Sequence, residues 1–392
     1  MSIRVLFLTT RNVKKPAGGG ELKTFKMISH LRGIYDLNVI CLGFKSNIDQ
    51  YETGVYALDR GVSGRSLYNL VRSYFHGQLL SVYRNKSSSL FSKISDIAVN
   101  YDVIFVDHYV MYQYVLEFTN AKIILHQHNA EYLMWERLAE LEANRIKRFL
   151  IRLEAKRIRG YEKKICKHAT KILAAPNDIE ALSEPLGIPV NKFEVTYHLG
   201  DDSLLGLPSL VYEETKMKLL FLGTMTWQAN IDAVSWFLRD VWPVIIQKNS
   251  GILFEIVGNI DSRNKAKFES YDGVSVLGFV EDINKVFTNA RIFVSPLRFG
   301  SGMKVKNVTA MYRGLPMVTS DVGAEGIGLS NGINVLIANN SAEFISAIQS
   351  LLDDQSLWEN LSLNSREYAE VNLSWESVLD SINDIVNTVA HI

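Results

Sequence analysis

The strongest chemical signal in the 392-residue sequence is a glycine-rich loop that runs into two lysines at the start of a predicted helix. The loop is Ser295-Pro296-Leu297-Arg298-Phe299-Gly300-Ser301-Gly302-Met303, followed by Lys304 and Lys306. Backbone amides at a helix N-terminus bind diphosphate groups, especially beside fixed cations. Lysines at this end oppose the helix dipole, and a bound anion relieves that cost. A diphosphate cradle and a solvated lysine pair are the two interpretations.

A second glycine run, Gly18-Gly19-Gly20-Glu21, follows the first apolar run of the chain and opens another predicted helix. Glycines let the backbone approach a ligand closely, and a phosphate is the natural guest at a helix start. The run lacks the spacing of the dinucleotide fingerprint, and no Lys-Ser/Thr pair follows as in a P-loop. It therefore predicts either a phosphate-binding turn or an ordinary strand–helix turn.

Polar residues gather after the fourth predicted strand, residues 122–126, in the segment His126-Gln127-His128-Asn129-Ala130-Glu131. Doubly wound folds place their working residues at the carboxyl ends of strands, which is the position of this segment. Two histidines at i and i+2 with no third ligand nearby make a weak zinc motif, so we predict no metal. Ligand-binding histidines and buried, hydrogen-bonded histidines both remain open.

Short apolar runs alternate with helical patterns along the whole chain and would position these segments. The predicted strands span residues 4–8, 37–41, 103–106, 122–126, 171–174, 193–196, 218–222, 253–257, 274–277, 292–294, 317–319 and 334–337. The predicted helices include 21–31, 133–168, 232–247, 304–312 and 341–353, and residues 357–389 are predicted to be helical throughout. Continuous apolar runs are typical of parallel strands buried on both faces. The alternation predicts an α/β protein with doubly wound parallel sheets.

The alternation restarts after the polar, turn-rich stretch 200–216, where we place the domain boundary. Residues 1–205 form the predicted first domain, residues 206–372 the second, and residues 373–392 a C-terminal helix. Two Rossmann-like domains of this type would face a cleft between them, which is the expected ligand site.

Charge and cysteine content exclude some classes of protein. Basic and acidic residues number 42 each, so a strongly basic nucleic-acid binder is not expected. Residues 1–200 hold 28 basic and 19 acidic residues, a net charge of +9, and the remainder is correspondingly acidic. Cys41 and Cys166 form no disulfide framework, which indicates a reducing compartment. No apolar stretch is long enough to span a membrane, so we expect a cytoplasmic protein.

One predicted helix carries a basic stripe. Basic residues recur at spacings of three or four on one face, at Arg148, Arg152, Lys156, Arg159, Lys163 and Lys167. Apolar residues line another face, at Ile146, Leu150, Leu153, Ile158, Tyr161 and Ile165. The stripe predicts either a helix that lies on an anionic membrane or the solvated face of a helix whose apolar side packs on the sheet.

Taken together in their order along the chain, the motifs of this sequence resemble those of the GT-B-fold retaining glycosyltransferases of family 4, once called group 1. The resemblance covers nearly the whole chain. The resemblance is closest to the bacterial polysaccharide-assembly members. It rests on the Gly18–Glu21 loop, His128-Asn129, Leu222-Gly223-Thr224-Met225-Thr226-Trp227 with Asn230, the segment from Arg298 to Lys306, Gly314-Leu315-Pro316, Gly323-Ala324-Glu325-Gly326 and Ser374-Trp375-Glu376. The last of these resembles the family's closing helix, which crosses back onto the N-terminal domain.

The resemblance implies transfer of a hexosyl group from a nucleotide-diphosphate sugar to an acceptor hydroxyl, with retention and without a cofactor. The acceptor would be a lipid-linked or growing glycan in cell-surface polysaccharide synthesis, at the inner membrane face. His128 would contact the transferred sugar, and Lys306 and Arg298 would stabilise the leaving diphosphate. The implied donor-binding residues are Gly19, Gly20, Gly223, Gly300, Ser301, Gly302, Met303, Lys304, Thr309 and Glu325. The implied acceptor-side residues are Glu21, Asn129 and Glu131.

The sequence departs from the family pattern in two places, the donor loop and the segment 222–230. Ser301 and Thr309 stand where the pattern has glutamates that meet the sugar and the ribose. An arginine–lysine pair of many relatives is absent from residues 222–230, and Lys306, with Arg298 or Lys304, is its predicted replacement. A non-catalytic homologue that binds glycans or supports a partner therefore remains the alternative function. An epimerase or a phosphorylase of the same fold is a more remote one.

Overall fold

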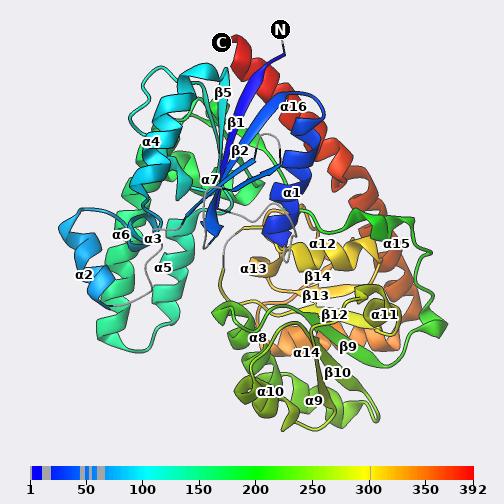
Figure 1. Cartoon of the computed structure of the whole chain (residues 1–392). Helices are drawn as coiled ribbons and strands as arrows, with labels where there is room; N and C mark the ends of the chain where they lie inside the picture. The colour runs from blue at the N-terminus through cyan, green and yellow to red at the C-terminus, as the bar shows by residue number, and fades with distance from the viewer. Residues whose placement is uncertain (1, 11–18, 45–48, 53–54, 60–66, 301) are drawn as a thin grey trace. The chain divides into compact units, whose positions relative to one another are not determined.

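A computed structural model describes residues 2–10, 19–44, 49–52, 55–59, 67–300 and 302–392. The chain divides into two compact units: Met1–His198 with Val378–Ile392, and Leu199–Ser377. Figure 1 labels the helices and strands of both. The second unit begins at Leu199, whereas the sequence places the boundary at residue 206.

The first unit is built on an eight-stranded sheet in the order β3-β4-β2-β1-β5-β6-β7-β8. The strands are β1 (Arg4–Thr9), β2 (Asp36–Phe44), β3 (Asp49–Glu52), β4 (Val55–Asp59), β5 (Val103–Asp107), β6 (Ile123–His126), β7 (Lys171–Ala174) and β8 (Phe193–Val195). All neighbours are parallel except β3 and β4. Every residue of β5 is buried, as the continuous apolar run predicts for a strand covered on both faces.

Helices cover both faces of this sheet. They are α1 (Gly19–Arg32), α2 (Leu67–Phe75), α3 (Leu80–Arg84), α4 (Ser88–Ile97), α5 (Glu131–Leu141), α6 (Arg145–His168), α7 (Pro176–Leu182) and most of α16 (Trp375–His391). The helix α16 lies beside α1, where Asn383 and His30 are hydrogen-bonded at 2.7 Å (Figure 1). Tyr35 donates to the carbonyl of Asn383, and Lys122 donates to the carbonyl of Ala390. The C-terminal helix is therefore part of the first unit.

The second unit holds a six-stranded parallel sheet in the order β11-β10-β9-β12-β13-β14. Its strands are β9 (Lys218–Leu222), β10 (Leu253–Val257), β11 (Val274–Gly278), β12 (Ile292–Ser295), β13 (Met317–Thr319) and β14 (Leu336–Ile337). Its helices are α8 (Gln228–Asp240), α9 (Trp242–Lys248), α10 (Ser262–Glu269), α11 (Ile283–Thr288), α12 (Val305–Tyr312), α13 (Asp321–Ala324), α14 (Ser341–Asp353) and α15 (Gln355–Asn372). The strand order reverses between β9 and β12, where doubly wound sheets bind ligands.

The predicted α/β architecture with parallel sheets is confirmed, and each of the predicted strands overlaps an observed one. The strands β3 and β4 were not predicted. The sequence of β3, Asp-Gln-Tyr-Glu, holds one apolar residue and so lacks the pattern of a buried strand. The sequence of β4, Val-Tyr-Ala-Leu-Asp, does hold a short apolar run, which the sequence analysis overlooked.

Three predicted helices are each two helices. Residues 133–168 break at 142–144, where the side chain of Asn144 caps α6 by accepting from the amides of Ile146 and Lys147. Residues 232–247 break at Val241, because Pro243 in the first turn of α9 cannot continue the preceding helix. Residues 357–389 break at 373–374, where Ser374 accepts from the amide of Ser377. At these three breaks a polar capping residue or a proline ends the helix, although the apolar periodicity continues.

Among the described residues, no helix is long and apolar enough to cross a membrane. Both cysteines are buried as free thiols.

Candidate functional site

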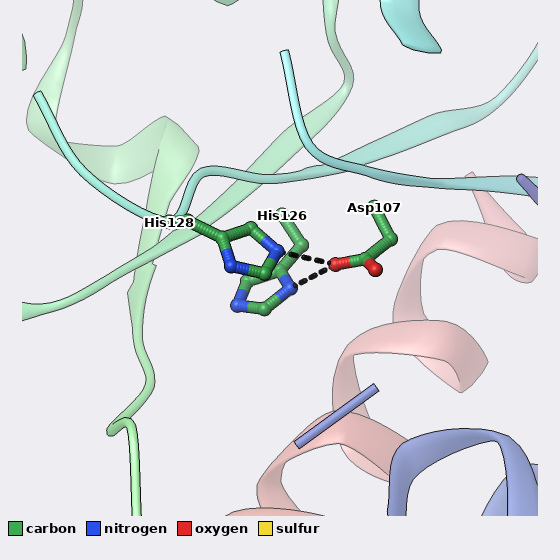
Figure 2. Close-up of side chains that lie close together, drawn as sticks. All are labelled: Asp107, His126 and His128. Atoms are coloured by element: carbon green, nitrogen blue, oxygen red, sulfur yellow. Dashed lines mark hydrogen bonds and ion pairs between the residues drawn. The ribbon is translucent and has the colours of Figure 1, made fainter. Parts of the chain in front are cut away.

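A buried carboxylate connects three neighbouring strand ends of the first unit. Asp107 ends β5, His126 ends β6, and His128 follows two residues later. Figure 2 shows both imidazole rings pointing to one carboxylate oxygen of Asp107. This oxygen, Oδ1, lies 2.8 Å from His126 Nδ1 and 2.6 Å from His128 Nε2. The other oxygen accepts from the hydroxyls of Thr9 and Thr24, both at 2.8 Å.

The charge of Asp107 decides which nitrogen of each histidine carries a proton. Burial disfavours ionisation, but the charge of His128 and the hydrogen bonds from both histidines outweigh it, and the pKa of Asp107 lies well below its ordinary value. An ionised carboxylate can only accept hydrogen bonds. His126 Nδ1 and His128 Nε2 must therefore both donate. Whenever the His128 ring is uncharged, Nδ1 is then a hydrogen-bond acceptor.

Further basic side chains lie near Asp107, His126 and His128. The Lys23 ammonium is buried and donates to the hydroxyl of Thr196 at 2.9 Å. Burial lowers the pKa of Lys23 to about 7. The ring of His198 lies 5.1 Å from that of His128, and burial, with the charge of Lys23, holds its pKa well below the usual value. The ring of His108 lies 5.3 Å from that of His128, and the backbone of His108 has a φ of 90°. Such a strained backbone is typical of functional sites.

The sequence analysis missed Lys23, Asp107, His108 and His198. Asp107 and His108 directly follow the predicted strand 103–106, so the rule that identified His126 and His128 would have found them too. His198 follows the predicted strand 193–196 by two residues and so carries the same signal. Lys23 carries no such signal, because it approaches the cluster from α1.

The ligand atoms of Asp107, His126 and His128 lie within 4.8 Å of one another, close enough to hold a metal ion. The hydrogen-bond arrangement does not favour one. Each carboxylate oxygen of Asp107 already accepts two hydrogen bonds. The nitrogens nearest to it, His126 Nδ1 and His128 Nε2, carry the protons that they donate to Asp107. Asp107 is fully hydrogen-bonded in this network, whereas His126 Nε2 is buried without a hydrogen-bond partner among the described residues.

The predicted acceptor-side residues lie at the start of α5. Asn129 and Glu131 are partly buried. Glu162 of α6 holds this turn, because its carboxylate accepts from the amides of Glu131 and Tyr132 at 2.9 and 3.0 Å. Burial raises the pKa of Glu162 to about 8, and it raises the pKa of Glu131 as well. Gly19 and Gly20 begin α1, whereas Gly18 and the side chain of Glu21 lie outside the described residues.

In the second unit, Lys306 lies in the first turn of α12, beside the carboxyl end of β9. Its ammonium donates to Asn230 Oδ1 at 2.8 Å and lies 4.2 Å from the centre of the Phe221 ring. Removal of water from this ammonium, with a contribution from Lys304, lowers the pKa of Lys306 to about 7. No carboxylate forms an ion pair with it among the described residues. A bound anion would supply the missing charge.

The other two predicted cations are paired. Lys304 lies 3.8 Å from Glu325 and donates to the carbonyl of Gly302. Arg298 binds Asp232 of α8 through two nitrogens, one of them at 2.8 Å. The structure thus brings Lys304, Glu325 and the glycine loop together, and it holds Arg298 on α8.

Glycines allow close approach of the backbone around this loop. A Cβ on Gly258 would lie 2.2 Å from the carbonyl of Gly223, so the loops after β9 and β10 touch there. Gly300 and Gly302 have φ angles of 141° and 72°, which side chains rarely adopt. Ser301 lies outside the described residues. Met303 is buried.

Thr309 uses its hydroxyl within its own helix, where it donates to the carbonyl of Val305 at 2.9 Å. A Cβ on Gly200 would lie 2.7 Å from this hydroxyl oxygen, so Gly200 packs closely against Thr309. Two polar atoms missed by the sequence analysis lie nearby. Asn307 Oδ1 and Ser295 Oγ are buried without a hydrogen-bond partner among the described residues.

Comparison with protein families matches residues 216–354 to the model for glycosyl transferases group 1. An uncharacterized 44.6 kDa protein in the cps region of Klebsiella pneumoniae is 27% identical over 172 residues, which cover 42% of this chain and 44% of that protein. The putative glycosyltransferase YtcC of Bacillus subtilis is 24% identical over 28% of each chain. The matches thus span less than half the length of these relatives.

Solved structures match over almost the whole chain. Sucrose-phosphate synthase from Thermosynechococcus elongatus superposes with a TM-score of 0.71 at 14% identity, covering 99% of each chain. Anabaena HepE, solved in complex with UDP and glucose, superposes with a TM-score of 0.68 at 13% identity and covers 98% of this chain and all of its own. At these identities the likeness shows the fold. The chain therefore has the two-domain α/β fold of the GT-B glycosyltransferases, and its residues 216–354 match the model for glycosyl transferases group 1.

Proposed function

We propose that the protein is a retaining glycosyltransferase that moves a hexosyl group from a nucleotide-diphosphate sugar to an acceptor hydroxyl. One observation carries the proposal: Lys306 lies at the N-terminus of α12 with a pKa lowered to about 7 and with an amide oxygen as its hydrogen-bond acceptor. This position lies within the segment that matches the group 1 model. A cation beside helix N-terminal amides suits a diphosphate. The complexes of HepE with UDP and with UDP-glucose support this choice of donor.

The proposed step breaks the bond between the anomeric carbon and the diphosphate oxygen. The acceptor oxygen bonds to the same face of the sugar, and its proton passes to the departing diphosphate. Negative charge grows on the diphosphate as the bond breaks, so Lys306, Lys304 and the amides of α12 stabilise the transition state. Arg298 would add a further positive charge at the edge of the loop, positioned by Asp232.

His128 would contact the transferred sugar. Its Nε2 donates to Asp107, so in its uncharged form the ring offers Nδ1 as an acceptor for a sugar hydroxyl. In this proposal Asp107 orients His128 and acts through it. The enzyme needs no metal and no cofactor for these roles.

The acceptor in our proposal is a lipid-linked or growing glycan of a cell-surface polysaccharide, reached from the cytoplasmic side of the membrane. The relative in the cps region of Klebsiella pneumoniae supports this setting. WaaG, a glycosyltransferase involved in lipopolysaccharide biosynthesis, shares the fold with a TM-score of 0.65.

Donor binding can be tested by a thermal-shift screen with nucleotide-diphosphate sugars and free nucleotide diphosphates. A ligand at a hundred times its Kd adds about 2.7 kcal/mol, enough for a shift of a few degrees. We expect one donor to stand out and Lys306→Met to abolish its effect. Lys248→Met, an exposed lysine on α9, serves as the matched control and should leave the shift unchanged.

The pKa of Lys306 adds a sharper readout for the same ligand. In the free protein at pH 8, an ammonium with a pKa of about 7 is mostly neutral. A bound diphosphate raises this pKa, so binding at pH 8 should take up close to one proton, and binding at pH 5.5 should take up almost none. Calorimetry in buffers of different ionisation enthalpy measures the uptake. Equal uptake by wild type and Lys306→Met would contradict the assignment.

The second candidate is a non-catalytic homologue that binds glycans or supports a partner transferase. Thr309 favours it, because its hydroxyl donates within its own helix and Gly200 packs against it. Weak nucleotide binding without turnover of any donor, across a panel of acceptors, would favour this candidate.

A further inference from the structure

The N-terminal half of α6 exposes apolar side chains that its sequence pattern predicts to be buried. Four of them recur at spacings of three, four and seven residues and so share one face of the helix. They are Ile146, Phe149, Leu150 and Leu153, with exposed fractions of 73%, 66%, 47% and 37%. Farther along the same helix, Ile158 is only 2% exposed. Only the C-terminal half of α6 therefore packs into the core of the first unit, which corrects the expectation that the whole apolar side packs on the sheet.

Basic residues border this exposed face. Residues 145–153 contain four basic residues and no acidic one. Arg145 and Arg152 lie four residues before and three residues after Phe149, and Lys147 lies three before Leu150, so all three are neighbours of the apolar residues on the helix surface. The apolar–basic patch comprises Arg145, Ile146, Lys147, Phe149, Leu150, Arg152 and Leu153.

Two carboxylates near the patch, those of Glu142 and Glu154, accept hydrogen bonds. The carboxylate of Glu142, at the turn before α6, accepts from the amide of Asn144 at 2.8 Å. Glu154 is buried and pairs with Arg157 at 2.6 Å. Residues 145–153 therefore carry only positive charge, and Glu140 and Glu142 are the nearest carboxylates before them in the sequence.

The helix α2, which is attached to α6, exposes a second apolar set. Its Tyr68, Val71 and Phe75 are 66%, 46% and 87% exposed. Tyr74 of α2 donates to Glu154 of α6, and the Arg157 guanidinium lies 3.8 Å from the centre of the Tyr74 ring. Both helices lie in the first unit (Figure 1).

We infer that the apolar–basic patch docks the protein on an anionic phospholipid surface. Apolar side chains on one helix face enter the boundary between headgroups and acyl chains, while the basic side chains beside them reach the lipid phosphates. A second copy of the chain fits less well, because two copies joined by this patch would bring like charges together. The inference deepens the proposed function by naming the surface that would carry a lipid-linked acceptor, and it can fail independently of donor binding.

The test is sedimentation of the full chain with vesicles of phosphatidylcholine, alone or mixed with phosphatidylglycerol. We expect binding to the anionic vesicles only, weakened by salt. Replacing both Arg145 and Arg152 with Gln should lower the partition coefficient about 30-fold, at about 1 kcal/mol for each basic side chain. Phe149→Ser should lower it about tenfold or more by removing one inserted ring.

Matched controls carry the same changes elsewhere. Lys248→Gln with Arg263→Gln removes two exposed positive charges from the second unit, and Leu363→Ser removes a side chain that is 57% exposed on α15. Both should bind vesicles like the wild type. The inference is overturned if the wild type does not bind anionic vesicles, or if the charge control loses as much binding as the patch variant. It is also overturned if Phe149→Ser only dissociates a dimer in sedimentation velocity. Nucleotide binding by a protein that ignores vesicles would leave the proposed function standing.

Discussion

At the scale of single residues, Asp107 organises the candidate site of the first unit. Its two oxygens accept four hydrogen bonds, from His126, His128 and Thr9 at neighbouring strand ends and from Thr24 of α1. Because the carboxylate is ionised, it selects one tautomer of each histidine. His128 thereby acquires a defined acceptor atom, which an isolated histidine on a loop would lack.

Asp107→Asn is the sharpest test of this role. An amide in the same place both donates and accepts, so His128 is no longer restricted to one tautomer. We expect turnover to fall by about 100-fold, an ordinary size for a disturbed catalytic histidine, and stability to fall by about 2 kcal/mol. Nitrogen NMR of the histidine rings should report Nε2 protonation of His128 in the wild type and a mixture of tautomers in the variant.

Thr24→Val is the control for Asp107→Asn. It removes one hydrogen bond to the other carboxylate oxygen, with an expected loss of about 1 kcal/mol, and leaves both histidine contacts in place. A tautomer shift of His128 in Thr24→Val as large as in Asp107→Asn would argue that the whole cluster, rather than the carboxylate, orients the ring.

At the scale of elements, helix ends decide where the site residues lie. The break between α5 and α6 turns one predicted helix into an antiparallel pair, which Figure 1 shows side by side. This pairing brings Glu162 of α6 against the amides at the start of α5, next to His128. A continuous helix would carry Glu162 far from this turn. Asn144, which caps α6, is therefore important for the position of the acceptor-side residues.

Asn144→Ala should destabilise the start of α6. The side chain accepts from the amides of Ile146 and Lys147 at 3.0 and 3.1 Å, and loss of such a cap costs about 1 kcal/mol. Urea unfolding followed by circular dichroism measures the change. Asn144→Asp keeps an acceptor at this position and should retain most of the stability; equal losses in both variants would exclude the cap as the cause.

At the scale of the whole molecule, the C-terminal helix α16 packs with the N-terminal part of the chain, from which it is far apart in sequence. The indole of Trp375 donates to the carbonyl of Gly200 in the second unit, and the residues of α16 from Val378 onward belong to the first unit. Val386 and Val389 are fully buried there. The final residues thus complete the core of the unit that begins at the N-terminus.

Val386→Asp should therefore destabilise the first unit, although it lies near the end of the chain. A charge buried among apolar side chains without a partner costs several kcal/mol, so we expect a fall in Tm of more than about 5 °C. Ile392→Asp, at a residue that is 72% exposed, is the control and should leave Tm nearly unchanged. Unchanged melting of Val386→Asp would show that α16 contributes little to that core.

The sequence alone determined the class of fold and the strand ends that carry the candidate site. Continuous apolar runs separated by helical patterns leave few alternatives to parallel sheets, and glycine, histidine and lysine clusters stand directly after those runs. This information is local, so it can be read residue by residue. It was enough to single out His128, the glycine loop and Lys306 as candidate site residues.

Only the tertiary structure decided which groups face one another. Asp107 meets His126 and His128 because β5 and β6 are neighbours in the sheet, and Lys23 reaches the same cluster from α1, more than eighty residues earlier. The pKa of Lys306 depends on burial beside Phe221 and Asn230, which lie on other elements. The exposure of the apolar face of α6 could not be predicted from the sequence either, because amphipathic periodicity does not show whether another element covers that face. Contacts between residues distant in sequence arise from packing, and packing is a property of the folded chain.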